Sequence, residues 1–67
     1  MDTVAIPTRL EAALAARGLT TRDLSRSTGI RDRTLYRYVR GTREPRAGEA
    51  LAIARALGVE AEELWGR

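Results

Sequence analysis

The sequence predicts an all-α fold made of five short helices. Apolar residues recur at i, i+3 and i+4 spacing along the chain, whereas no stretch of convincing length alternates with period two. Glycines follow the first four periodic stretches, as expected where helices end in a left-handed backbone conformation. These glycines are Gly18, Gly29, Gly41 and Gly58. With 67 residues, the chain is expected to form one domain over 1–67, with a modest core.

The first two helices are expected over about residues 7–17 and 20–27. In the first, Leu10 and Leu14 share one face, and Thr8 stands three residues before Glu11, the spacing of a capping box. The second opens with Thr20-x-x-Asp23, an acidic version of the same box, and points Leu24 inward. A tight turn through Thr28-Gly29-Ile30 then leads to the third helix.

The remaining three helices are expected over about 32–40, 47–57 and 61–65. The third ends at Gly41, and the last is barely one turn long. The apolar stripe of the fourth helix repeats at helical spacing. It consists of Ala50, Ile53, Ala54 and Leu57.

The composition excludes several classes of protein. There are no cysteines, so a disulfide scaffold and a thiolate metal site are ruled out. There is no histidine, the commonest general base and metal ligand, so neither an enzyme nor a cofactor is expected. The first ten residues hold Asp2 and Pro7 and no sustained apolar run, so they predict neither a signal peptide nor a membrane span. We therefore expect a cytoplasmic protein without a membrane partner.

Positive charge is concentrated in the middle of the chain. All twelve basic residues are arginine, and six of them fall within residues 31–46, beside only two acids. The C-terminal stretch reverses the sign with Glu60, Glu62 and Glu63. A basic block of this kind is typical either of an ordinary solvated surface or of a surface that meets a polyanion.

The third helix decides between these readings. On a helical wheel of about 100° per residue, Leu35, Tyr38 and Val39 cluster on one side, which must face the core. Three arginines project from the opposite side, with Tyr36 at its margin. They are Arg33, Arg37 and Arg40. Like charges at positions 33 and 37 repel one another by a few tenths of a kcal/mol. This cost favours an anionic partner for the arginine face.

With this spacing, the sequence resembles the phage repressor and Cro-type, or XRE, helix-turn-helix family over about residues 10–65. The residues that carry the resemblance are Leu24, Ser25, Gly29, Ile30, Leu35, Tyr38, Gly41, Pro45 and the run Ala54-x-x-Leu57-Gly58-Val59. Ser25 suits a close crossing of two helices, and Gly29 supplies the turn that sets their angle. The resemblance implies a lambda-repressor-like domain with a helix-turn-helix over about 21–40. It also implies a transcriptional regulator, most simply a repressor, that binds double-stranded DNA on the nucleoid.

Three positions depart from the family pattern. Thr21 stands where the family usually has an amide; its hydroxyl can still reach a phosphate. Asp32 stands where an uncharged or basic residue is common, and it either accepts from a cytosine amino group or complements the helix dipole. Many members pair an arginine of the first helix with a glutamate near the end of the third. Here the aligned residues are Leu14 and Val39, which we predict to be in van der Waals contact.

Site roles follow from the way such a motif meets DNA. Residues of the third helix that enter the major groove are expected to read bases. These are Asp32, Arg33, Tyr36 and Arg37. Residues where the chain crosses the sugar-phosphate backbone are expected to contact phosphates. These are Thr21, Arg22, Arg40, Thr42, Arg43 and Arg46.

One small domain reads few base pairs, so the sequence predicts a homodimer on an inverted repeat. No small-molecule ligand is expected, because the chain shows no sensing domain. Trp65 and Leu64 either close the core against the first helix, the reading we favour, or form a dimer seam as well. Two alternatives use the same basic face: a module that binds an acidic protein, and an antitoxin. Salt-dependent binding to random DNA would disfavour the first, and the lack of a spare toxin-binding segment disfavours the second.

Overall fold

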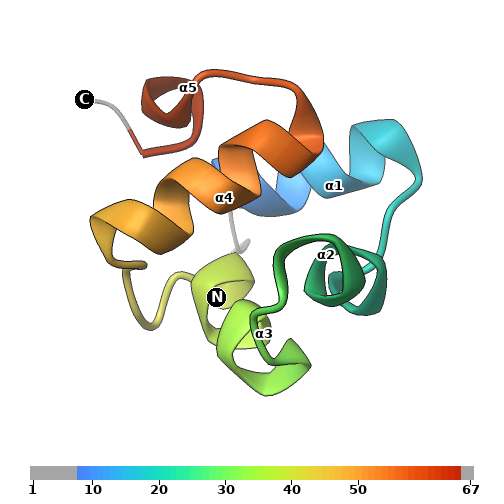
Figure 1. Cartoon of the computed structure of the whole chain (residues 1–67). Helices are drawn as coiled ribbons and strands as arrows, with labels where there is room; N and C mark the ends of the chain where they lie inside the picture. Colours follow the sequence, from blue (N-terminus) through green and yellow to red (C-terminus); the bar gives the residue numbers. More distant parts are fainter. Residues whose placement is uncertain (1–7, 66–67) are drawn as a thin grey trace, which may run out of the picture.

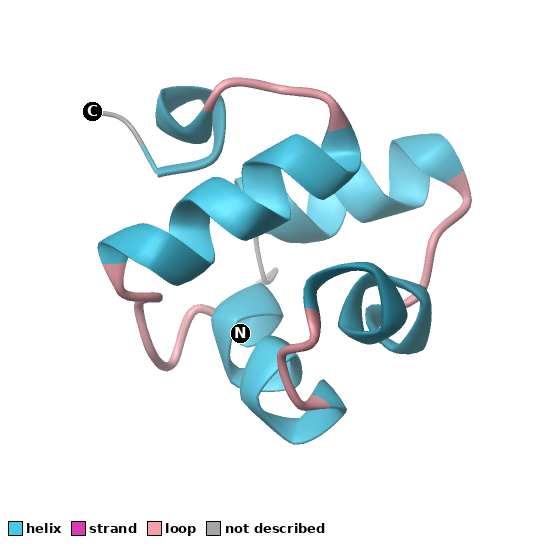
Figure 2. Cartoon of the chain, viewed as in Figure 1, coloured by secondary structure: helices cyan, strands magenta, loops and turns pink. Residues whose placement is uncertain are grey.

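The computed structural model describes residues 8–65, which form five α-helices joined by short loops and contain no strand (Figures 1 and 2). The helices are α1 (Arg9–Arg17), α2 (Thr21–Thr28), α3 (Asp32–Arg40), α4 (Ala47–Leu57) and α5 (Ala61–Trp65). The all-α prediction is confirmed, and the last three helices have the predicted bounds. The second helix extends one residue beyond Ser27, and the expected start of the first at Pro7 lies outside the described residues. No helix in the described part combines the length and apolar character needed to cross a membrane.

Side-chain caps begin the first two helices. The Thr8 hydroxyl accepts from the Glu11 amide at 3.0 Å, and it donates to the Val39 carbonyl at 2.6 Å, which ties the start of α1 to α3. At the start of α2 both halves of the predicted box are formed: Asp23 N–H donates to Thr20 Oγ1 at 3.1 Å, and Thr20 N–H donates to Asp23 Oδ2 at 2.9 Å. Because its hydrogen bonds with Thr20 favour the charged form, the pKa of Asp23 is lowered.

Hydroxyl groups hold the turn between α2 and α3. Ser25 Oγ donates to the Ile30 carbonyl at 2.5 Å. Thr28 Oγ1 donates to the Leu24 carbonyl at 2.8 Å and accepts from the Ile30 amide at 3.2 Å. Ser25 therefore does more than leave space at the helix crossing, because it also anchors Ile30, the last residue of the turn.

Gly29 ends α2 with φ +77°, where an L side chain is strained. A methyl group at Gly29 would meet no atom within 4 Å, so alanine there would test backbone strain alone. Gly48 supplies a matched control, because it lies inside α4 and also has open space around its Cβ position.

We expect Gly29→Ala to lower the free energy of unfolding by about 1 kcal/mol or more, since it forces a left-handed alanine. Gly48→Ala should instead raise the free energy of unfolding by as much as about 1 kcal/mol, because alanine is the better helix former. Urea unfolding followed by circular dichroism measures both changes. Equal effects of the same sign would contradict the assignment of strain to the turn.

One core joins all five helices. The four most deeply buried large side chains come from four different helices: Leu10, Leu24, Leu35 and Ile53. In Figure 1, α4 crosses the centre of the view, with α5 above it and α2 and α3 below it. The tertiary contacts agree, because α2 packs on both α3 and α4, and α1 packs on α3 and α5. This packing holds α3 from one side and leaves its other side at the surface.

The C-terminal helix closes the core, as predicted. Leu64 is buried, and the half-buried Trp65 packs against the core cluster, to which Leu10 of α1 also belongs. Leu14 and Val39 are both buried in this same cluster, at 5% and 7% exposure. Their common burial supports the apolar pairing inferred from the sequence, while direct contact between them stays a prediction.

Candidate nucleic-acid interface

Helix α3 divides cleanly into a buried and an exposed side. Leu35, Tyr38 and Val39 are buried, as the helical wheel predicts. The residues on the other side are all exposed. They are Arg33, Tyr36, Arg37 and Arg40. Helices α1 and α2 pack on α3, and the four residues of this arginine face stay exposed, so the face is available to an external partner.

The arginine side chains differ in the contacts that they make. Arg17 is structural: its Nε donates to the Leu57 carbonyl at 2.9 Å, so it ties the end of α1 to the end of α4. Arg40 contacts Tyr36 in two ways. Its guanidinium carbon lies 5.7 Å from the ring centroid, and its Nη1 donates to the phenol oxygen at 3.3 Å. Within residues 8–65, Arg33 and Arg37 make no side-chain hydrogen bond and no ion pair. Their donors are therefore unused within the part of the chain that the structure describes.

Tyr36 and Arg40 form a pair on this face. The sequence assigned Tyr36 to bases and Arg40 to a phosphate, as separate roles. Because the cation lies over the ring, moving one side chain disturbs the other. The i, i+4 spacing was the sequence signal for this pairing.

The first turn of α3 carries Asp32. The preceding residue, Arg31, gives the helix no side-chain cap, and the Asp32 side chain is exposed. A carboxylate in this place interacts favourably with the positive end of the helix dipole. It is also free to meet a base edge, so both readings of Asp32 fit its position.

Two predicted phosphate contacts lie at the start of α2. Arg22 is exposed and Thr21 is half-buried. The Thr21 hydroxyl makes no hydrogen bond within the part of the chain that the structure describes. Helix α2 packs directly on α3, so these two residues belong to the same substructure as the arginine face.

The α3–α4 loop (residues 41–46) carries the other predicted phosphate contacts. Arg43 and Arg46 are exposed. Thr42 is already bound to the end of α3. Its amide donates to the Arg37 carbonyl at 3.0 Å, and its hydroxyl donates to the same oxygen at 3.2 Å. To donate to a phosphate, the Thr42 hydroxyl must first leave this carbonyl. The sequence did not reveal this competition.

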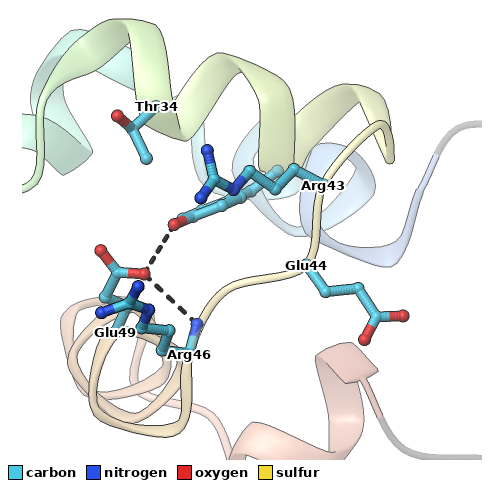
Figure 3. Close-up of a pocket in the computed structure, with 6 residues that line it drawn as sticks. Thr34, Arg43, Glu44, Arg46 and Glu49 are labelled. Carbon is cyan, nitrogen blue, oxygen red and sulfur yellow. Dashed lines mark hydrogen bonds between the residues drawn. The ribbon is translucent and has the colours of Figure 1, made fainter.

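Tyr38 and Glu49 connect α3 to α4 across this loop (Figure 3). The Tyr38 phenol donates to Glu49 Oε1 at 2.6 Å, and the Arg46 amide donates to the same oxygen at 3.2 Å. These hydrogen bonds lower the pKa of the Glu49 carboxyl, and the bond to Glu49 raises the pKa of Tyr38. The sequence treated Tyr38 only as a core residue. Its phenol was the available signal, because a buried tyrosine hydroxyl usually finds a partner.

Acid should weaken this connection. Glu49 has a lowered pKa in the folded state, so its stabilising contribution is complete above the ordinary carboxyl pKa of about 4.3 and is lost as pH falls through the lowered value. We expect Tyr38→Phe to reduce the free energy of unfolding by about 1 kcal/mol near neutral pH, a value kept low because Glu49 is partly solvated. The difference in the free energy of unfolding between this variant and the parent should shrink as the pH is lowered below the range in which carboxyl groups titrate.

Urea unfolding measured from pH 7 to pH 3 checks this expectation. Tyr36→Phe is the control, because the Tyr36 hydroxyl only accepts a long bond from Arg40 at the surface. A difference between Tyr38→Phe and the parent that stays constant over the whole pH range would contradict the role of the Glu49 carboxylate.

Comparison with known proteins agrees with the helical fold. A protein-family model described as helix-turn-helix matches residues 10–64. This range includes all five helices except Arg9 at the start of α1 and Trp65 at the end of α5. No curated protein and no solved structure matches the chain.

Proposed function

Since this chain belongs to the XRE-type helix-turn-helix family of DNA-binding regulators, we propose that it recognises a specific double-stranded DNA site and represses transcription there. The observation that carries the proposal is the exposed arginine face of α3, where Arg33 and Arg37 have no partner among residues 8–65. Guanidinium donors on the exposed side of a helix suit entry into the major groove. The protein would act in the cytoplasm, on the nucleoid.

Base reading is assigned to the side chains of α3. Arg33 and Arg37 lie about one helical turn apart, so each can reach the O6 and N7 atoms of a guanine with two hydrogen bonds. Tyr36 would contact a base edge while it supports Arg40. Asp32, in the first turn, would accept from a cytosine amino group.

Backbone binding is assigned to residues around this helix. They are Thr21, Arg22, Arg40, Thr42, Arg43 and Arg46. Arginine and hydroxyl side chains at the edges of a recognition helix neutralise or hydrogen-bond phosphates without reading sequence. They would set the register of α3 in the groove and account for most of the salt dependence of binding.

A two-fold dimer would supply enough sequence information for a useful site. We expect two copies of α3 to lie about 34 Å apart on the same face of the duplex. The half-buried Trp65 supports a seam near the C-terminus, because its ring can cover the core on one side and a neighbour on the other.

Selection of bound sites from random duplexes tests the function and the dimer together. We expect an inverted repeat whose half-site centres are about 10 base pairs apart, and affinity that falls steeply with salt. Recovery of a single half-site, bound one to one, would contradict the dimer. Failure to enrich any site would contradict sequence-specific binding.

A further inference from the structure

A notch of about 310 Å³ opens beside the arginine face, between α3, the α3–α4 loop and the start of α4 (Figure 3). It is lined by Thr34, Tyr38, Arg43, Glu44, Arg46 and Glu49. The share of liquid volume of one water molecule is about 30 Å³, so the notch can hold a phosphate group together with several waters.

Thr34 places this notch next to the residues assigned to base reading. On the surface of α3, Thr34 neighbours Arg37 at i+3 and Tyr38 at i+4. Arg37 belongs to the exposed arginine face, whereas Tyr38 turns toward the core and Glu49. Thr34 therefore stands at the border between the groove-facing side of α3 and the notch, and it is half-buried there.

The hydroxyl of Thr34 makes no hydrogen bond to any residue that the structure describes. Six of the eight serine and threonine hydroxyls in residues 8–65 take part in hydrogen bonds within the protein; they are those of Thr8, Thr20, Ser25, Ser27, Thr28 and Thr42. Only Thr21, already assigned to a phosphate, and Thr34 have none within this range. A hydroxyl without an internal partner at the rim of a polar notch is a ready donor to an anion.

Among the described residues, the side-chain donors of the notch that make no hydrogen bond are two guanidinium groups and this hydroxyl. Arg43 and Arg46 make no side-chain hydrogen bond within residues 8–65, and Arg43 extends toward Thr34 in Figure 3. Of the two carboxylates, Glu49 has one oxygen already bound by Tyr38 and the Arg46 amide. The Glu44 side chain points away from Thr34 and Glu49 in the same view.

We propose that Thr34, Arg43 and Arg46 together bind one phosphate of the DNA backbone in this notch, and that Tyr38 and Glu49 are the positioning residues that shape it. The proposal rests on the proposed function. It adds Thr34 as a phosphate ligand and joins two arginines, first assigned separately, into one site.

The positioning role follows from the Glu49 hydrogen bonds. A single carboxylate oxygen accepts from α3 at 2.6 Å and from the last loop residue at 3.2 Å, so it fixes both walls of the notch. Holding the loop in place before DNA arrives reduces the ordering that binding must otherwise impose on Arg43 and Arg46.

Duplexes with single methylphosphonate substitutions test the site, because each removes the charge of one phosphate. The duplex is the site selected from random sequences, and the proteins are the full chain and its Thr34→Val, Arg43→Ala and Tyr38→Phe variants. Valine keeps the branched shape of threonine and removes only the hydroxyl. Circular dichroism at the assay temperature confirms that each variant is folded.

We expect one substituted position in each half-site at which the parent loses affinity but Thr34→Val and Arg43→Ala lose much less. On the unmodified duplex, Thr34→Val should weaken binding about 3- to 10-fold, equally for specific and scrambled sequences. In Tyr38→Phe, the methylphosphonate at this same phosphate should cause a smaller loss of affinity than in the parent. The losses of affinity, or penalties, caused by methylphosphonates at other phosphates should be unchanged. A merely destabilised protein would not show such a position-specific change.

Failure of this site and failure of the function give different results. If the parent binds DNA but no single phosphate loses its effect in both Thr34→Val and Arg43→Ala, the proposed phosphate site in the notch is wrong. The proposed DNA binding then still holds. If Tyr38→Phe changes the penalties at all phosphates alike, its positioning role is overturned. If the parent binds no duplex, the proposed function fails, and the notch as a DNA site fails with it.

Discussion

Val39→Glu is expected to reduce the free energy of unfolding by about 3 kcal/mol or more, enough to unfold much of a domain of this size. Val39 is only 7% exposed and lies in the core cluster with Leu14. No polar or charged side chain is buried in the described part of the chain, so a glutamate there would find no buried partner for its charge. It would either remain charged at a high cost or take up a proton.

Urea unfolding at low temperature, followed by circular dichroism, measures this loss. Ala12→Glu is the matched control, because it makes the same charge change at an exposed position of α1 and should alter stability by no more than about 0.5 kcal/mol. If Val39→Glu unfolds like the parent, position 39 is not in the core.

The double variant Leu14→Arg, Val39→Glu tests the pairing itself. It places at positions 14 and 39 the arginine and the glutamate that many members of the family pair there, so it should recover a large part of the stability lost in Val39→Glu. An additive loss from the two substitutions would mean that positions 14 and 39 are not in contact.

Arg37→Ala is expected to reduce affinity for the selected site by about 1–3 kcal/mol and to flatten preference at one base pair. Arg37 is exposed on α3 and makes no side-chain hydrogen bond within residues 8–65, so under the proposed function its removal would take away a contact with a base and leave the protein core intact. Binding to scrambled DNA should weaken much less.

Arg43→Ala is the matched comparison, because it removes the same side chain from the α3–α4 loop. It should weaken binding to the specific and the scrambled duplex alike. It should also reduce the slope of log affinity against log salt concentration by about one. Titrations of both variants on both duplexes across a salt series separate the two roles. The assignment is wrong if Arg43→Ala changes base preference while Arg37→Ala leaves preference intact.

The helices and the orientation of α3 could be predicted because their causes are local. Helix ends depend on residues within about four positions, such as Thr20 with Asp23 at a start or Gly41 at an end. The direction of each side chain around α3 follows from the constant rotation per residue. The exposed arginines could therefore be identified from the sequence before any packing was known.

Tertiary structure alone decided which distant groups meet. Nothing within four residues of Tyr38 indicates that its phenol donates to Glu49, eleven positions later. The bond from Arg17 to the Leu57 carbonyl spans 40 positions. Both depend on the angles at which helices cross, which are set by packing of the whole core rather than by local sequence. The sequence by itself thus determined the five helices and the exposed arginine face, whereas the notch beside Thr34 and the role of Glu49 emerged only when packing brought α3, the loop and α4 together.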